Sequence, residues 1–434
     1  MGLVIVLLIA AAIVWWWLAH RDGPPLPVGY SGPSSIVTAR AEEYPAADST
    51  LYFGQSTAGA SQENHEQQEG EVRAVWLSYL DLEPMLTGKS QEEFTKNCGE
   101  AMDNMKQMGI NTVIAQVRPF CDALYPSQYF PWSAYCTGVQ GVSPGYDPLE
   151  ILVREAHSRG LKLEAWVNPF RVRAANNSKP LSQQNPAGQW LEASDDAAVE
   201  YQGAIYLNPG RQKARELIIN GIREIADNYE VDGIHFDDYF YPSPDESFDA
   251  AAYSDYQDGG GELTLAQWRR QNVGELVHGV HEALAQCERK ILFGVSPQGN
   301  MKNNLNSQYI DIQAWIDAGD IDYLCPQIYY GFENESAPYQ TVVQEFSSMV
   351  RDSGVKLYVG LAPYKLGQED KWAGEDGKEE WKTSQSLLAR QIQAAREQTG
   401  YGGFALFRYG SLFTPGEQVS GQVQSEIQAM KQLF

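Results

Sequence analysis

The chain has 434 residues, of which 43% are hydrophobic and 12% aromatic, and it carries a formal net charge of −24 at pH 7. This hydrophobic share is enough for a large core, and single barrel domains often run past about 250 residues. The acidic residues are spread along the chain. A strongly negative surface argues against nucleic acid as a partner, because binding phosphates requires a basic surface. The negative charge does not exclude neutral glycans as partners.

The first segment of the chain is apolar. No charge lies between Leu3 and Leu18, and the run ends in three tryptophans, which favour a membrane interface. We therefore expect residues 1–21 to form a membrane anchor or uncleaved signal, giving a single-pass cell-membrane protein whose catalytic domain is extracytoplasmic. Residues 22–70 are rich in Pro, Gly, Ser, Ala, Gln and Glu, which predicts a flexible, disordered linker.

Residues 71–434 alternate short apolar runs with helical patterns. The runs predict eight strands at Val72–Ser78, Asn111–Arg118, Leu161–Asn168, Val231–Asp238, Lys290–Ser296, Ile321–Tyr329, Lys356–Ala362 and Gly402–Phe407. Helices are predicted at Glu92–Met108, Pro148–Ser158, Arg211–Asn228, Leu263–Ala285, Ile310–Ala318, Tyr339–Arg351, Ser384–Gln398 and Glu417–Leu433. Eight strands, each followed by a helix, indicate one α/β domain, a (β/α)8 TIM barrel. The rival fold, an open doubly wound sheet, would normally carry a Gly-rich phosphate loop, which we do not find.

Several predicted strands end in X-Pro, as at Arg118-Pro119 and Asn168-Pro169. Proline removes a ladder donor and keeps its predecessor extended, so it suits the point where a strand leaves the sheet. The loops after Arg118, Asn168 and Asp238 are long. They are expected to form walls at the C-terminal face of the barrel, where such folds keep their active sites.

Strand alternation predicts which side chains enter the barrel. The inward set is Gln116, Arg118, Glu164, Trp166, Asn168, His235, Asp237, Gln327 and Tyr329. Of these, Arg118, Asn168, Asp237 and Gln327 should surround one mouth. Inward polar groups are costly unless they pair or bind something, so they predict a site for a polar ligand.

Asp237 is the first catalytic candidate. A carboxylate at a central strand end can act as a nucleophile or stabilise an oxocarbenium-like transition state. The structural alternative is a buried Asp paired with Arg118 or hydrogen-bonded to His235. Arg118 is expected to lower the pKa of Asp237 and keep it ionised. For the second carboxylate we rank Asp238 first and Glu333 next, and then Glu164, for which a buried structural role is favoured.

Aromatic and amide side chains complete the predicted substrate site. Candidate sugar platforms, each as compatible with a core role, are Trp76, Trp132, Trp166, Tyr239, Tyr241, Tyr329 and Tyr364. Gln116, Arg118, Asn168, His235 and Gln327 join them as expected substrate-binding residues. The five cysteines show no zinc spacing, and neither a metal nor a cofactor is expected. Cys121 and Cys136 could pair if the compartment is oxidising. We expect a monomer.

These residues lie in segments that resemble the glycosyl-hydrolase-like family 10, a group of bacterial envelope proteins with a barrel fold. The matching segments are Arg73–Ser78, Gln116–Pro119, Ala165–Pro169, Gly233–Tyr239 and Pro326–Tyr329. The resemblance covers nearly all of the chain after Glu71. It implies an O-glycosyl hydrolase acting on a polysaccharide, with peptidoglycan strands or a related envelope glycan as the leading expectation.

The fourth strand also resembles a chitinase-type motif, Asp-Gly-x-Asp-x-Asp-x-Glu. Asp232-Gly233 and Asp237 match, but His235 replaces an Asp and Tyr239 replaces the catalytic Glu. A substrate-assisted mechanism that relies on that Glu is therefore in doubt. Two rival functions stay open: a non-catalytic glycan-binding barrel at the cell surface, and a metal-dependent hydrolase or deacetylase using His235, Asp237 and Asp238.

Overall fold

The structure is a computed structural model that describes residues 70–177 and 179–434. The predicted anchor (1–21) and all but the last residue of the predicted linker (22–70) lie outside the described residues. No helix within the described ranges combines the length and the apolar character needed to cross a membrane.

The core of the fold is a closed barrel of eight parallel strands. They are β1 (Val72–Leu77), β2 (Thr112–Arg118), β3 (Lys162–Val167), β7 (Gly233–Phe236), β8 (Leu292–Val295), β9 (Tyr323–Leu324), β10 (Lys356–Leu361) and β11 (Tyr401–Phe407). Each strand pairs with its neighbours in chain order, and β11 closes the barrel on β1. The predicted TIM barrel is confirmed, with all eight strands inside or close to their predicted ranges.

A helix follows each barrel strand. These helices are α4 (Gln91–Met108), α6 (Pro148–His157), α8 (Gln212–Asn228), α10 (Leu265–Ala285), α12 (Ile312–Ala318), α13 (Tyr339–Val350), α16 (Leu387–Arg396) and α18 (Ser420–Lys431). Local signals set their ends. In α4 the capping box of Ser90 and Glu93 begins the helix, and Gly109, at φ 95°, ends it in the left-handed conformation. Val113, Ala115 and Val117 point outward from β2 into the apolar layer beneath the helices.

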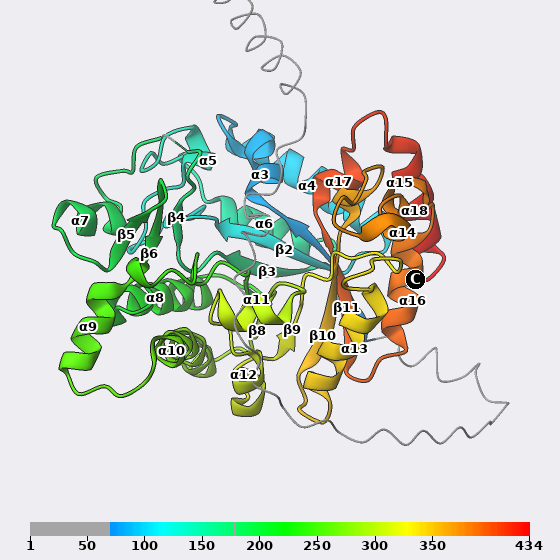
Figure 1. The fold of residues 1–434 in the computed structure, drawn as a ribbon. Helices are drawn as coiled ribbons and strands as arrows, with labels where there is room; N and C mark the ends of the chain where they lie inside the picture. Colours follow the sequence, from blue (N-terminus) through cyan, green and yellow to red (C-terminus); the bar gives the residue numbers. More distant parts are fainter. Residues whose placement is uncertain (1–69, 178) are drawn as a thin grey trace, which may run out of the picture. The chain divides into compact units, whose positions relative to one another are not determined.

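The remaining short elements were not predicted, and each lies between the C-terminal end of a barrel strand and the next helix. They are α3 (Tyr79–Leu86), α5 (Ala134–Thr137), β4 (Arg171–Arg173), α7 (Pro186–Glu192), β5 (Ala198–Tyr201), β6 (Ala204–Leu207), η1 (Glu246–Phe248), α9 (Ala250–Asp258), α11 (Met301–Asn306), η2 (Pro363–Lys365), α14 (Gly374–Gly377), α15 (Glu380–Thr383) and α17 (Tyr409–Phe413). Strands β4, β6 and β5 form a small antiparallel sheet. In Figure 1, α3, α5 and α17 lie at the upper end of the barrel.

The interior of the barrel holds a separate cluster of buried side chains. Its members are Ala74, Trp76, Ile114, Trp166, Tyr323, Cys325, Tyr358 and Ala405. The rings of Tyr323 and Tyr358 stack with centroids 4.4 Å apart. Gly294 on β8 makes room for this pair, because a Cβ at that position would lie 2.0 Å from Cζ of Tyr323.

Replacing Gly294 with alanine should therefore overpack the barrel interior. We expect Gly294→Ala to lower the free energy of unfolding by about 1–3 kcal/mol, measured by denaturant titration. Gly274→Ala is the matched control, since a Cβ on this α10 residue would meet nothing closer than Trp315 Nε1 at 3.9 Å. That change should stabilise the helix by about 0.5–1 kcal/mol. Equal effects of the two substitutions would contradict this account.

Candidate active site

Asp237 lies at the mouth of the barrel, directly after the end of β7. Its side chain is 3% exposed. Oδ2 accepts a hydrogen bond from Trp166 Nε1 at 2.9 Å, and Oδ1 accepts one from the backbone N–H of Tyr239 at 3.2 Å. Both oxygens are therefore held by neutral donors, one from β3 and one from its own loop. The predicted inward direction of Trp166 and Asp237 is confirmed.

Burial raises the pKa of Asp237 from its usual 3.8 to about 7, and the negative charge of Asp238 adds to this rise. The positive charge of Arg171 and the hydrogen bond from Trp166 oppose it. We expected Arg118 to lower the pKa of Asp237. Both the direction of the shift and the arginine named were wrong. Desolvation outweighs the nearby cation, and the cation that lowers the pKa most is Arg171. A carboxyl group of this kind can hold a proton near neutral pH.

A register shift explains why Arg118 does not enter the barrel. Strand β2 pairs with β3 through Gln116 and Trp166, but the next partner of Val167 is Arg118, so one residue is skipped. A bulge of this kind turns the following side chain to the other face. The Arg118 guanidinium lies 4.4 Å from the centre of the Phe130 ring and close to α8 at Gly221. The predicted inward orientation of Arg118 was therefore wrong.

Asp238 lies beside Asp237 and is half-buried. Its Oδ2 accepts hydrogen bonds from Gln298 Nε2 at 2.8 Å and from Gln308 Nε2 at 3.3 Å. Its Oδ1 accepts one from Gln327 Nε2 at 3.2 Å. Alternation would have turned Asp238 away from the mouth, but β7 ends at Phe236, and the side chain is instead held by amides from the loops after β8 and β9.

His235 and Glu164 belong to a hydrogen-bonded chain inside the barrel. Trp76 Nε1 donates to Nε2 of His235 at 3.2 Å, which places the proton of a neutral imidazole on Nδ1, 2.8 Å from the Tyr323 hydroxyl. That hydroxyl donates to Glu164. Burial lowers the pKa of His235 to about 3 and raises that of Glu164 to about 7. Glu164 has the structural position that we favoured for it.

Both ring nitrogens of His235 are thus engaged within the barrel, which does not fit a metal ligand shared with Asp237 and Asp238. In the part of the chain that the structure describes, no group of three His, Cys, Asp or Glu side chains is arranged to hold a metal ion. Cys121 and Cys136 are buried free thiols.

Aromatic rings gather around Phe407, at the end of β11. Its ring centroid lies 5.9 Å from that of Trp76, 6.0 Å from those of Tyr329 and Tyr364, and 6.4 Å from that of Trp166. Tyr329 and Tyr364 are half-buried. The structure thus brings four of the predicted sugar platforms together. Phe407 was not singled out, because its strand carries no polar residue at this end.

The other predicted residues are spread more widely. Gln116 accepts a hydrogen bond from the backbone of Tyr79 at 3.1 Å, and Oδ1 of Asn168 accepts one from the backbone of Arg171 at 3.3 Å. Tyr241 is buried 5.0 Å from Arg269, and Trp132 is half-buried in the loop after β2. The side chain of Glu333 is exposed. Its backbone N–H donates a hydrogen bond to Oε2 of Glu380, the first residue of α15, at 3.1 Å.

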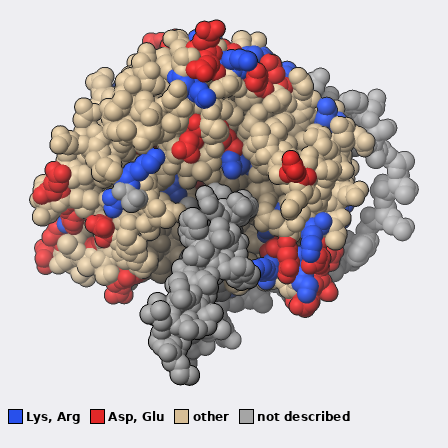
Figure 2. All heavy atoms as spheres, turned by 90° about the horizontal axis from the view of Figure 1, so that it is seen from above, with Lys and Arg blue, Asp and Glu red and all other residues tan. Residues whose placement is uncertain are grey.

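Arg171 is a charged residue of this mouth that sequence reasoning missed. It begins β4, three residues after Asn168, and its guanidinium carbon lies 4.0 Å from the centre of the Tyr239 ring. The only available signal was an arginine shortly after a strand-ending Asn-Pro. Figure 2 looks onto this end of the molecule and shows acidic and basic side chains close together around a hollow near its centre.

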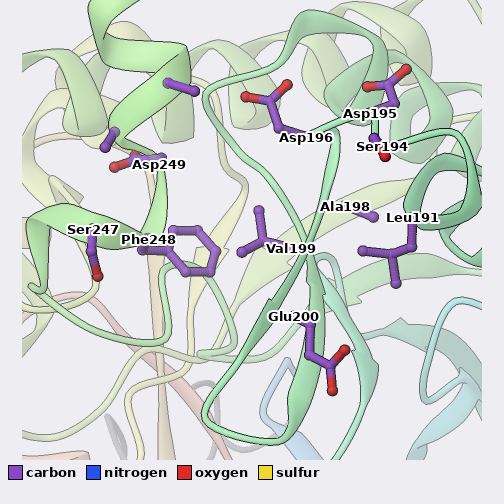
Figure 3. Close-up of a pocket in the computed structure, with 12 residues that line it drawn as sticks. Leu191, Ser194, Asp195, Asp196, Ala198, Val199, Glu200, Ser247, Phe248 and Asp249 are labelled. Atoms are coloured by element: carbon purple, nitrogen blue, oxygen red, sulfur yellow. The ribbon is translucent and has the colours of Figure 1, made fainter.

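A second concavity lies between β5 and the η1–α9 segment (Figure 3). Its carboxylates include Asp195 and Asp196, which form ion pairs with Lys213 and with Arg211, the latter at 2.6 Å. These charges are already paired, and the pocket contains none of the residues around Asp237.

The raised pKa of Asp237 makes folding stability depend on pH. Between about pH 4 and pH 7 the folded state keeps a proton that the unfolded chain has released, so stability falls as pH rises and levels off above 7. Asp237→Asn removes this dependence. We measure the free energy of unfolding of both proteins by urea titration at pH 5 and at pH 8. Between these two pH values, the parent should lose about 2–3 kcal/mol more than the variant does. If the difference in unfolding free energy between the two proteins is the same at both pH values, Asp237 titrates in its usual range.

Comparison with known proteins places this barrel among its relatives. The family model of glycosyl hydrolase-like 10 matches residues 71–374. Glycosyl hydrolase YngK of Bacillus subtilis (strain 168) is 36% identical over 321 residues, covering 69% of this chain and 62% of YngK. Glycosyl hydrolase DigH of Escherichia coli (strain K12) is 34% identical over 346 residues, covering 70% of this chain and 76% of DigH. The chain thus spans less than two thirds of the length of YngK.

Solved structures support the fold. The glycoside hydrolase domain of PgaB from Bordetella bronchiseptica superposes with a TM-score of 0.52 at 14% identity, covering 82% of this chain and 99% of that domain. The catalytic domain of beta-amylase from Paenibacillus polymyxa superposes with a TM-score of 0.54 at 14% identity, covering 84% of this chain and 98% of that domain. These likenesses concern the fold alone. The match to the family model, together with the relatives above 30% identity, shows that the chain belongs to the glycosyl hydrolase-like 10 family.

Proposed function

We propose that this protein is a glycosidase that hydrolyses an envelope or extracellular polysaccharide, with the glycan strands of peptidoglycan as the favoured substrate. The observation that carries the proposal is a buried carboxyl group, Asp237, with a pKa near 7 and a second carboxylate beside it at the barrel mouth. Two carboxyl groups in different environments are what acid-catalysed glycoside hydrolysis requires. Family membership and the names of YngK and DigH support the same reaction class.

In this proposal Asp237 is the proton donor. Its proton passes to the glycosidic oxygen as the bond from that oxygen to the anomeric carbon breaks. The positive charge that develops on the sugar is stabilised by the carboxylate of Asp238, which the three glutamine amides hold in place. Water then adds to the anomeric carbon, and its proton returns to Asp237. Strand position alone suggested a nucleophile or a stabilising carboxylate at Asp237, whereas its raised pKa favours the role of acid and base.

The aromatic cluster around Phe407 is the proposed sugar platform. Half-buried Tyr329 and Tyr364 present ring surface at the mouth, which suits the apolar faces of a pyranose. Trp166 contacts both this cluster and Asp237. Binding of a sugar ring there would bring its glycosidic bond close to the proton donor.

We also propose that residues 1–21 anchor the protein in the cell membrane and that residues 22–70 tether the barrel on the extracytoplasmic side. The uncharged run from Leu3 to Leu18 and the polar composition that follows it support this placement. A membrane-tethered monomer would act on polysaccharide within reach of its linker.

Digestion of a glycan panel tests the activity. The panel holds peptidoglycan strands with and without stem peptides, and chitin oligomers, with released oligosaccharides read by mass spectrometry. We expect products from the parent and a loss of about 10²–10⁴-fold in rate for Asp237→Asn. Glu345→Gln, an exposed residue of α13, is the control and should match the parent. Glycan binding without products from any substrate would favour a non-catalytic surface barrel.

The pH dependence of the rate tests the role of Asp237. A proton donor must be protonated in the free enzyme, so kcat/KM should fall about tenfold per pH unit above a pKa near 7. A nucleophile would give the opposite limb, with kcat/KM rising through pH 7. Any residual activity of Asp237→Asn should lack this limb. A rise of kcat/KM through pH 7 would contradict the acid role.

A further inference from the structure

The Arg171 guanidinium is buried at the mouth between aromatic rings. The side chain is 5% exposed. Its Cζ atom lies 4.6 Å from the centre of the Phe120 ring and 4.0 Å from that of Tyr239. These rings contact the face of a guanidinium and leave its N–H groups, which lie in the plane, available at the edge. The position is fixed by the backbone N–H of Arg171, which donates to Asn168 Oδ1 at 3.3 Å.

The protein supplies no hydrogen-bond acceptor to this guanidinium among the described residues. Within the described ranges, the Arg171 side chain donates no hydrogen bond and forms no ion pair, and its Nε is buried without a partner. Arg269 shows how the same fold treats another buried arginine: its Nε donates to both oxygens of Asp249, at 3.1 and 3.2 Å, and its Nη1 donates to the Tyr309 hydroxyl at 3.0 Å. A buried cation without such partners is costly, which points to a partner supplied by a ligand.

Arg171 and the proposed proton donor share one residue, Tyr239. Its backbone N–H donates to Asp237 Oδ1 at 3.2 Å, while its ring packs against the guanidinium. The other oxygen of Asp237 accepts from Trp166, so Arg171 influences Asp237 through its charge and does not hydrogen-bond it. Arg118 and Arg173 also have buried nitrogens without a partner among the described residues, but Arg118 lies on Phe130 against α8, and Arg173 forms an ion pair with Glu200 at 3.9 Å.

We propose that Arg171 binds a carboxylate carried by the sugar at the cleaved bond, so that the substrate is an acidic glycan. This inference rests on the proposed glycosidase function and narrows its substrate class. The planar N–H fork of arginine matches a carboxylate in two parallel hydrogen bonds. An anionic sugar placed beside the Asp238 carboxylate, in a chain of net charge −24, needs a local cation to offset the repulsion. The carboxylate could belong to a uronic acid or to a lactyl ether on an amino sugar.

Binding measurements on matched ligands test the assignment without relying on turnover. All proteins carry Asp237→Asn so that the ligands stay intact. Calorimetry compares lactyl-bearing glycan oligomers with their methyl esters, and uronate-bearing oligomers with their methyl esters. Chitin oligomers, which carry no carboxylate, are measured with and without added salt. One of the two acids should bind about tenfold or more tightly than its ester, and which acid does so identifies the source of the carboxylate.

Substitutions then locate the preference. Arg171→Gln should abolish the preference for the acid over the ester, and Arg171→Lys should keep part of it, since it retains the charge without the fork. Arg173→Gln is the matched control, because Arg173 lies on the same strand and pairs with Glu200 at 3.9 Å. Thermal melting verifies that each variant folds.

The outcomes separate the two proposals. Equal affinity of the parent for both acids and their esters, or a preference that survives in Arg171→Gln, overturns the role of Arg171 and leaves the glycosidase proposal standing. Failure of every oligosaccharide to bind, together with an absence of digestion products, overturns the glycosidase and the Arg171 assignment with it.

Discussion

A closed eight-stranded barrel leaves an interior that side chains must fill, and here a connected chain of hydrogen-bonded groups runs among the apolar side chains that fill it. Glu164, Tyr323, His235 and Trp76 are linked by successive hydrogen bonds across the barrel. Because each group has a partner, the chain can be buried without unpaired donors or acceptors, and its members are held in fixed orientations. Trp166, whose indole N–H donates to Asp237, belongs to the same buried cluster as Trp76 and Tyr323, so the packed interior supports the carboxyl group at the mouth.

The two neighbouring aspartates differ because the strand ends between Phe236 and Asp237. Asp237 continues the inward pattern of β7 and is buried under the indole of Trp166. Asp238 follows after regular pairing has stopped, and glutamine amides from other loops hold it half-exposed. Adjacent residues within a strand would face opposite sides, so this early end allows both carboxyl groups to serve one mouth.

Most of the barrel could be predicted from the sequence because two periodicities, of strand and of helix, are repeated eight times. Alternation also placed Trp166, His235 and Asp237 correctly. It failed at Arg118, because a bulge in β2 skips one residue, and nothing in an apolar run marks where a bulge occurs. Alternation along the barrel strands could not find Arg171, because this residue lies on β4, which pairs with β6 outside the barrel.

The sign of the pKa shift at Asp237 was also beyond sequence reasoning. The presence of an arginine can be read from a sequence, but the degree of desolvation cannot, and at Asp237 desolvation is the larger effect. Burial depends on how completely the side chains of several strands close over one group. The role assigned to this carboxyl therefore changed once the packing was known.

The sheet of β4, β6 and β5 lies wholly within the segment between β3 and α8, whereas Asp237 and Asp238 follow β7. The groups proposed to carry out the chemistry and the group proposed to select the sugar therefore stand on separate stretches of chain. An exchange of residues in the inserted sheet can alter which glycan is accepted while the barrel strands stay the same. Proteins of this family with nearly identical barrel motifs can thus differ in substrate, and the insertion after β3 is the place to compare them.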